Sequence, residues 1–407
     1  MKKTFFLYIA ASIALFCSCV DYSDEAHYIS AKVQITAPED FTKEANLNGH
    51  TITLTNTLGA TVKAATDANG LASFTGLIPD VYTVSTSWDI TSDEYSDLTG
   101  DNIVNDGAVV TGNINNLLIK DDNDQVTLPT VLSINRSLVI GKIYYAGSKD
   151  KNNKNYVAGQ YLELYNQSDE PVNVAGLYIG FVESNSTPAY TLEQLDEKFE
   201  DSVVICKQVF RIPNDNPHVI EPGKSVVITN SAINHTVNAE HEKNLLTADF
   251  EAKDESGKTI NNPDVPALKL IYSSFAAISK INFINGGPNG VIIFKTDDNI
   301  AEIEPIYSYG KTKGTMWLPI PKKYVIDGVD ILKYNTKGVD ISTKHLYNDI
   351  DGGYATISAV SGYNAEVLYR KTSTRKGKSG QKILQDTNNS TNDFKISTTI
   401  NIREYDD

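Results

Sequence analysis

The sequence predicts an all-β protein made of two tandem β-sandwich domains that follow an N-terminal signal segment. Three observations support this. Polar and apolar residues alternate in short stretches such as Ile29–Thr36; Asn, Asp and Gly separate these stretches as turn residues; and only 2 Met are present in 407 residues. A chain of this length exceeds one ordinary domain, so more than one core is expected.

The N-terminus has the pattern of a bacterial lipoprotein signal peptide. Lys2 and Lys3 form a positive start, Phe5–Phe16 is an apolar stretch of signal-peptide length, and Ser18 precedes Cys19. Lipoprotein signal peptidase reads a small residue before a cysteine at this place, so we expect cleavage there and lipid on the Cys19 thiol. Several acyl chains on one residue give stable membrane anchoring. The alternative is an ordinary secretory signal with an incidental cysteine.

Residues 19–28 form a polar, acidic segment after the expected cleavage point. This segment resembles the tether of surface-exported lipoproteins of Gram-negative gut anaerobes. The resemblance implies a protein that is lipid-anchored in the outer membrane and faces the cell exterior. A plain linker, with the protein facing the periplasm, is the alternative. No apolar run after residue 19 has the length that a membrane-spanning helix needs.

Charge and cysteine content narrow the range of functions. The net charge is -15, and loss of Lys2 and Lys3 with the signal makes the mature chain more acidic. An acidic body repels phosphate backbones, so no nucleic-acid partner is expected. Once Cys17 is removed and Cys19 carries lipid, Cys206 remains alone and no intrachain disulfide can form. Its apolar neighbours in the sequence predict a small buried side chain rather than a nucleophile.

Residues 29–137 are predicted to form the first domain. Alternation from residue 29 indicates a half-buried strand, and residues 52–54 repeat the pattern. The stretch 66–87 resembles the transthyretin-like, carboxypeptidase-regulatory-like sandwich, which implies a spacer or docking module without chemistry of its own. Asp80 stands where that family usually has Gly. The matching residues are Asp67, Gly70, Phe74, Gly76, Leu77, Pro79 and Tyr82.

Acidic turns in this domain raise the question of a cation site. Asp67 is expected to cap its own turn. Residues 121–124 form an acidic hairpin tip that lacks the residue order of an EF-hand loop. Calcium binding is the alternative at this tip, but the sequence as a whole predicts neither a metal nor a cofactor.

Residues 138–407 are predicted to form the second domain. A strand ending in Glu-Leu-Tyr-Asn, a Ser-Asp-Glu-Pro turn and a Gly-x-Tyr-Ile strand resemble the lamin-tail immunoglobulin-like domain. That resemblance implies a sandwich. The matching residues are Glu163, Leu164, Tyr165, Asn166, Pro171, Gly176, Tyr178 and Ile179.

Later stretches extend the lamin-tail resemblance. Residues 220–228 match its Pro-Gly turn before a buried strand, 291–294 match a further strand, and 384–394 match its closing Asp-Thr to Asp-Phe segment. The usual domain is about half this size, so residues 183–219, 230–285 and 300–380 are interpreted as large insertions or extra strands. The whole chain also resembles gut-bacterial surface lipoproteins classified only as a domain of unknown function, which implies a location but no activity.

No complete catalytic or metal-binding motif is recognisable, so no catalytic residue is predicted. His235 and His241, with Glu240 and Glu242, have neither helical nor hairpin spacing for zinc and are interpreted as solvated surface. Glu302 and Glu304 are expected to share one face of a strand, whereas a glycosidase needs two carboxylates across a cleft. The basic stretch 370–382 is expected to be a solvated flexible loop; contact with an acidic partner or a glycan is the alternative.

Aromatic residues offer the best indication of a binding site. Tyr307, Tyr309, Trp317 and Tyr324 lie close together in the sequence, followed by Tyr334. Exposed Tyr and Trp supply stacking faces for sugars and contact surfaces for peptides. Packing in the core or along strand edges is the alternative for all of them.

These observations favour a lipid-anchored cell-surface protein that binds or scaffolds a macromolecular or glycan ligand without catalysis. Its expected partners are the membrane, through the N-terminal lipid, and an outer-membrane transporter or an extracellular glycan. Two other functions stay open: a hydrolase of extracellular polymers, and a structural spacer that binds nothing specific.

Overall fold

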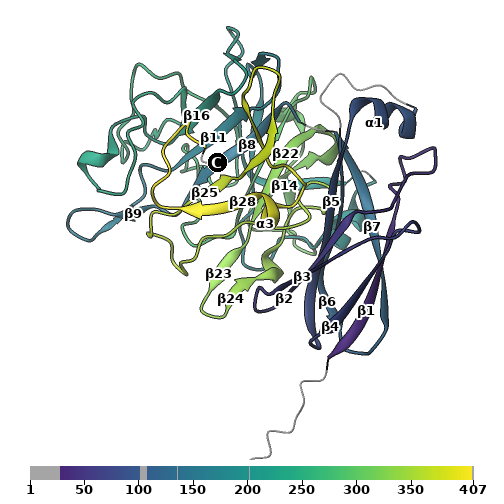
Figure 1. The fold of residues 1–407 in the computed structure, drawn as a ribbon. Coiled ribbons are helices and arrows are strands. Elements are labelled where there is room, and N and C mark those ends of the chain that lie inside the picture. Colours follow the sequence, from purple (N-terminus) through teal and green to yellow (C-terminus); the bar gives the residue numbers. More distant parts are fainter. Residues whose placement is uncertain (1–27, 101–107, 135, 201, 406–407) are drawn as a thin grey trace, which may run out of the picture.

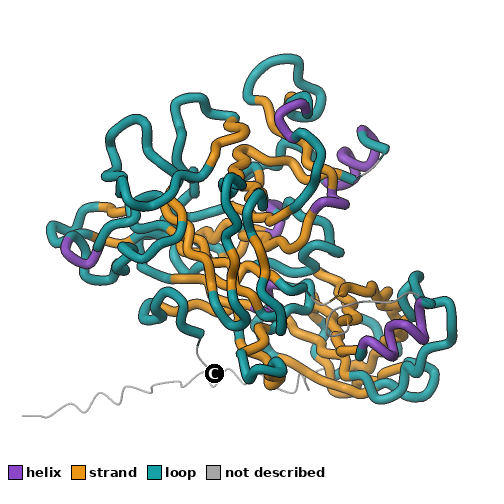
Figure 2. Tube along the Cα trace, turned by 90° about the horizontal axis from the view of Figure 1, so that it is seen from above, coloured by secondary structure: helices purple, strands orange, loops and turns teal. Residues whose placement is uncertain are grey.

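The computed structural model describes residues 28–100, 108–134, 136–200 and 202–405. It confirms the all-β prediction, because strands dominate and the helices are few and short (Figure 1). The described chain forms a smaller and a larger body that lie side by side, with long loops over the larger one (Figure 2). The expected signal peptide, Cys19 and all of the tether except Tyr28 lie outside the described residues.

The smaller body has one seven-stranded sheet in the order β3-β2-β5-β6-β7-β1-β4. β1 and β7 are parallel, and the other neighbours are antiparallel. The edge strands β3 and β4 approach each other, so the sheet folds over one apolar core as a sandwich. The elements are β1 (Ile29–Thr36), β2 (Thr51–Asn56), β3 (Thr61–Ala65), β4 (Leu71–Leu77), β5 (Asp80–Ile90), α1 (Ser92–Thr99), β6 (Ala108–Ile119) and β7 (Asp124–Ile134).

Local sequence signals predicted this body well. β1 alternates between buried and more exposed residues as expected. Asp67 caps its own turn, because its Oδ1 accepts hydrogen bonds from the backbone N–H groups of Asn69 and Leu71 at 2.8 and 2.9 Å. The Tyr82 hydroxyl donates to the carbonyl of Ile78 at 2.7 Å and closes the next turn. Within the described residues, no group of three or more His, Cys, Asp or Glu side chains could hold a metal ion.

The larger body contains two main sheets, in the orders β17-β16-β11-β8-β25-β28 and β20-β21-β14-β13-β19-β22, with β18 also paired to β14. The strands of the first sheet are β8 (Leu138–Tyr144), β11 (Tyr161–Asn166), β16 (Ser225–Thr229), β17 (Phe250–Glu251), β25 (Val367–Arg370) and β28 (Phe394–Ser397). Those of the second are β13 (Tyr178–Val182), β14 (Val203–Arg211), β18 (Lys269–Ser273), β19 (Asn289–Phe294), β20 (Ile306–Tyr307), β21 (Met316–Pro321) and β22 (Val325–Ile331).

Short elements connect and cover these sheets. The paired short strands are β9 (Ser148–Lys149) with β10 (Asn155–Tyr156), β12 (Val172–Asn173) with β15 (Val219–Ile220), β23 (Lys333–Asn335) with β24 (Gly338–Asp340), and β26 (Thr372–Lys376) with β27 (Lys382–Leu384). The helices are α2 (Leu192–Lys198), α3 (Ser390–Asp393) and the 3-10 turns η1 (His235–Val237), η2 (Ile300–Glu302), η3 (Lys322–Tyr324) and η4 (Ile341–Thr343).

The two main sheets enclose the largest core of the molecule. Side chains of β8, β11 and β16 pack against those of β13, β19 and β22. The opposite face of the second sheet is also buried, under segments that include Ile300, Leu346 and Ile350. Cys206 lies on this face as a buried free cysteine, as predicted. Stretches interpreted as insertions or extra strands therefore supply essential parts of the sandwich, including β14, β21 and β22.

The residues that resemble the lamin-tail domain hold the larger body together. Glu163 on β11 lies opposite Lys142 on β8, and Nζ of Lys142 is 3.1 Å from both carboxylate oxygens. The side-chain amide of Asn166 donates to the carbonyls of Glu170 and Ile220, which fixes the turn after β11. The motif is thus explained by packing and hydrogen bonding.

The structure corrects two sequence interpretations. The basic stretch forms the β26–β27 hairpin, and its first residue, Arg370, is buried because it pairs with Asp327 and Asp386 at 2.9 Å. His235 and Glu242 are buried rather than on a solvated surface. The Tyr144 hydroxyl donates to Glu242 at 2.7 Å. Neither burial was recognisable locally, because each partner comes from a distant part of the chain.

Polar side chains join the two bodies. Arg136, which lies between β7 and β8, reaches the carboxylate of Asp386 and the side-chain carbonyl of Asn388 at 3.2 and 2.6 Å. Asn113 of β6 donates to the carbonyl of Gly352 at 2.5 Å and accepts from the side-chain amide of Asn389 at 3.1 Å. Asn389 is also the N-cap of α3, so this short helix is fixed against the smaller body.

Candidate functional site

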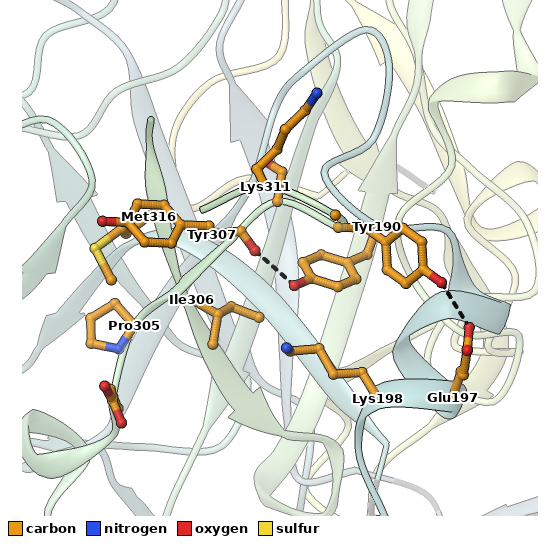
Figure 3. A pocket seen from close by; sticks show the side chains of 12 residues that line it. Tyr190, Glu197, Lys198, Pro305, Ile306, Tyr307, Lys311 and Met316 are labelled. Carbon is orange, nitrogen blue, oxygen red and sulfur yellow. Dashed lines mark hydrogen bonds between the residues drawn. The ribbon is translucent and has the colours of Figure 1, made fainter. Parts of the chain in front are cut away.

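A cleft of about 600 Å³ opens at the edge of the second sheet of the larger body (Figure 3). We call it the tyrosine cleft, because Tyr190, Tyr307 and Tyr309 line it. Its walls are the segment from Glu304 to Lys311, which includes the edge strand β20, and the helix α2. Its volume lies within the usual range of small-ligand sites, roughly 300–1,000 Å³.

Local sequence places α2 beside the cleft. Thr191 and Gln194 form a capping box, in which each side chain accepts a hydrogen bond from the backbone N–H of the other residue. The helix therefore begins directly after Tyr190. Its last turn directs Glu197 and Lys198 towards the cleft, where Nζ of Lys198 lies 6.0 Å from the centroid of the Tyr190 ring (Figure 3).

Hydrogen bonds hold the tyrosines in fixed positions. The Tyr190 hydroxyl donates to the backbone carbonyl of Tyr307 at 2.7 Å, and the Tyr309 hydroxyl donates to Oε2 of Glu197 at 3.0 Å (Figure 3). The backbone N–H of Tyr309 donates to the carbonyl of Ala189 at 2.9 Å. The rings of Tyr190 and Tyr309 meet edge to face, with centroids 5.8 Å apart. The Glu197 carboxylate raises the pKa of Tyr309, so this hydroxyl stays protonated as a donor.

Trp317 supports the cleft from inside the protein. Only 3% of this residue is exposed, so it packs in the core with Tyr190 and Ile205 and offers no stacking face to a ligand. Its indole N–H donates to the hydroxyl of Ser308 at 3.0 Å, which positions the loop after β20. Phe275 meets its ring edge to face.

The predicted aromatic residues therefore separate into two groups. Tyr307 and Tyr309 line one cleft, and 43% of Tyr309 is exposed. Tyr324 lies elsewhere, in η3, where its hydroxyl donates to Asp298 and its ring packs against the outer core of the second sheet. Tyr334 lies in β23, outside the cleft.

The residues of the α2 wall of the cleft were not predicted as site residues from the sequence. Tyr190, Glu197 and Lys198 lie in a stretch interpreted as an insertion or extra strands, although the Thr191-x-x-Gln194 capping box was a recognisable helix start. Glu304 also lines the cleft. It follows the 3-10 turn η2 rather than lying on a strand with Glu302, so the prediction of a shared strand face was wrong.

The cleft combines aromatic faces with charged groups of both signs. The rings and Ile306 provide apolar contact, while Glu197, Glu304, Lys198 and Lys311 provide acceptors and donors. Such a surface suits a ligand that has both apolar faces and polar edges.

Residues 221–400 match the sequence model of a family described as protein of unknown function (DUF4876). The match confirms the expectation of a domain of unknown function. The matched range contains β20 and β21 of the tyrosine cleft but not α2, which precedes it. No catalytic function is indicated by this family description, and no curated protein matches the chain.

One solved structure is similar to this chain over most of its length. The chain is similar to a DUF4876 family protein from Bacteroides thetaiotaomicron, with 20% identity and a TM-score of 0.58, over 90% of this chain and 94% of that one. At this identity, the likeness shows a shared fold.

Two other structures match more weakly. A candidate adhesin from Bacteroides ovatus has 11% identity and a TM-score of 0.21, over 75% of this chain and 87% of that one. A DUF3823 family protein from Parabacteroides merdae has 8% identity and a TM-score of 0.16, over 48% and 97%. Scores of this size carry no argument about fold or function.

Among the residues that the structure describes, no helix is long and apolar enough to pass through a bilayer.

Proposed function

We propose that this protein is a lipid-anchored protein of the bacterial outer membrane that faces the cell exterior and binds a glycan or another macromolecular ligand in the tyrosine cleft. The observation that carries the proposal is the cleft itself, in which Tyr190, Tyr307 and Tyr309 stand beside carboxylates and amines. The lipoprotein pattern at Cys19 supports the proposed location. Catalysis is not expected.

A sugar chain matches this cleft chemically. The C–H faces of a pyranose ring stack on aromatic rings, and its hydroxyls both donate and accept hydrogen bonds. Tyr309 offers an exposed ring whose hydroxyl and backbone are both anchored, at Glu197 and Ala189. Because the ring is already fixed, little side-chain entropy is lost on binding, and this favours affinity.

A glycan array tests binding in the cleft. We expect the wild-type chain, without its signal segment, to bind one or more glycans. The double variant Tyr307→Ala/Tyr309→Ala should bind at least about tenfold more weakly, because it removes contact residues that each contribute more than about 1 kcal/mol to binding. Tyr28→Ala is the matched control, since 61% of Tyr28 is exposed on the other body. Equal binding by the double variant contradicts binding in the tyrosine cleft. No binding by the wild type contradicts the proposed binding function and leaves a structural spacer.

Metabolic labelling with a fatty acid analogue tests the anchor. We expect label on the wild-type protein and none on Cys19→Ala, which should also leave the membrane fraction. Protease added to intact cells then separates an exterior from a periplasmic orientation. A labelled Cys19→Ala protein would contradict lipid attachment at this residue.

The hydrolase alternative has one supporting observation, because Glu197 and Glu304 line the same cleft. Release of reducing ends from a polymer that binds the cleft, abolished by Glu304→Gln, would establish it. We expect bound glycan to be recovered intact.

A further inference from the structure

A second pocket, of about 220 Å³, lies between the two bodies of the protein. We call it the junction pocket. The smaller body contributes residues of β5, β6 and β7, and the larger body contributes residues around Gly352 and α3, which lies against the smaller body (Figure 1). It shares no lining residue with the tyrosine cleft.

The lining of the junction pocket is uncharged and rich in amides and hydroxyls. Among its described residues, no Asp, Glu, Lys, Arg or His is present. Pro129 and Val131 add apolar contact from β7. The polar side chains that line it are Thr86, Thr111, Asn113, Asn348, Thr387, Asn388, Asn389 and Asn392.

Part of this polar lining is fixed by the protein. Asn389 Nδ2 donates to Asn113 Oδ1 across the junction at 3.1 Å. A Cβ at Gly353 would lie 2.0 Å from the side-chain oxygen of Asn389, so glycine is needed there for Asn389 to hold its place. Arg136 donates to the side-chain oxygen of Asn388 from behind at 2.6 Å. The pocket is therefore preorganised by contacts from both bodies.

Other polar side chains of the lining have hydrogen-bonding capacity to spare. Within the described part of the chain, three side-chain groups make no hydrogen bond to the protein: the hydroxyl of Thr111 and the carboxamides of Asn348 and Asn392. Thr111 is nevertheless buried, whereas Asn348 is exposed. Two carboxamides and one hydroxyl together can donate and accept several hydrogen bonds to a ligand.

We propose that the junction pocket binds one neutral, hydroxyl-rich ring, such as a single monosaccharide unit. Apolar cavities of about 150 Å³ hold benzene, so about 220 Å³ accommodates a six-membered ring with its substituents. Amides and hydroxyls pair with sugar hydroxyls in both directions, while Pro129 and Val131 contact the apolar edge of the ring. A carboxylate or an ammonium group would be desolvated here without a counter-charge, which disfavours charged sugars.

The site is independent of the tyrosine cleft and does not depend on the proposed function. Because both bodies line it, a bound ring bridges them, and binding stabilises the folded protein by mass action. A free sugar and the end unit of a glycan share the same chemistry, so the experiment includes both.

Ligand-observed saturation-transfer NMR tests the proposal on the chain without its signal segment. The probes are d-galactose and N-acetyl-d-glucosamine, each compared with a charged counterpart, d-galacturonic acid and d-glucosamine, and with its methyl glycoside. We expect at least one neutral probe to show saturable binding and to raise the thermal unfolding midpoint. Its charged counterpart should bind at least about tenfold more weakly, because its charge would be desolvated in the pocket without a counter-charge. If the methyl glycosides also bind, the ligand is best explained as the end unit of a glycan. If they do not bind, a free sugar is the better explanation.

Variants assign the site. Thr111→Val and Asn392→Leu preserve side-chain volume, and each should lower affinity at least about tenfold by leaving a sugar hydroxyl unpaired. Tyr307→Ala/Tyr309→Ala should leave this affinity unchanged, although the same variant is expected to weaken binding in the tyrosine cleft. Unfolding midpoints without ligand check that each variant folds. Failure of every neutral probe to saturate, or equal binding by both junction variants, overturns the proposal.

Discussion

The buried pair Lys142–Glu163 gives the strongest test of how the larger body is held together. Both side chains are 0% exposed, and the ammonium lies 3.1 Å from both carboxylate oxygens. The backbone N–H of Arg403 donates to the same carboxylate, and the ring of Tyr405 lies 3.7 Å from the ammonium. The C-terminal segment therefore covers the pair from the outer face of the first sheet.

Removing one partner should cost far more than removing both. Glu163→Leu removes the carboxylate that faces the buried Lys142 ammonium, and Lys142→Met leaves a buried carboxylate with fewer donors. Each change should lower the free energy of unfolding by about 3–5 kcal/mol. The double variant Lys142→Met/Glu163→Leu fills the same space with apolar atoms and should stay within about 1–2 kcal/mol of the wild type. The two single changes should thus couple by several kcal/mol.

Urea unfolding monitored by tryptophan fluorescence measures this coupling. The chain has 2 Trp, of which Trp88 lies in the smaller body and Trp317 is buried in the larger one. A Trp88→Phe background therefore reports on the larger body alone. With a urea m-value of about 3 kcal/mol/M, each single variant should lower the midpoint by at least about 1 M. Single variants that each cost less than about 1 kcal/mol, or a double variant whose cost equals their sum, would refute the reasoning.

Three further predictions concern stability. Burial lowers the pKa of Lys207 to about 7, so unfolding takes up a proton between about pH 7 and pH 10.5, and the free energy of unfolding should rise with pH across that window. Lys207→Met should remove this rise and increase the free energy of unfolding by about 1–4 kcal/mol at pH 7. Denaturation at several pH values measures both effects. Arg370→Met should destabilise the larger body by at least about 3 kcal/mol, measured by the Trp317 transition, because Asp327, Asp386 and Asp393 lose their shared cation. Asp67→Ala should cost about 1 kcal/mol in the smaller body, seen in the Trp88 transition, and Asp67→Asn, which keeps the accepting oxygen, should cost less.

The parts of the fold that depend on local pattern were predictable. The alternation in β1, the Asp67 turn and the Pro-Gly turn before β16 each need only neighbouring residues, and all three are present. The β6–β7 hairpin was recognised by its acidic tip, where Asp122 now accepts hydrogen bonds from Ser30. Such features are determined by backbone conformation and short-range side-chain hydrogen bonds.

Pairing across long sequence distances was not predictable. Arg370 reads as the first residue of a basic, solvated run, yet its guanidinium meets Asp327 from β22. The paired residues lie 43 positions apart in sequence, and no periodicity reveals such a pair. The same reason accounts for the tyrosine cleft. Its β20 wall was visible as a group of aromatics, whereas Tyr190 and α2 join it through tertiary contact from more than a hundred residues earlier.

The residues that carry the family resemblance explain why the resemblance indicates a fold and no ligand. Glu163 neutralises a buried lysine, Asn166 fixes a turn, and Asp386 and Asp393 surround Arg370. Each is satisfied inside the protein, so none is available to a ligand. The groups with free hydrogen-bonding capacity are other residues: the tyrosine cleft lies outside these motifs, and in the junction pocket Asn392 belongs to the closing segment whereas Thr111 and Asn348 do not. In this chain the residues of the buried polar network and the residues with capacity for a ligand are therefore largely different, so the motifs that predict the fold do not predict the ligand.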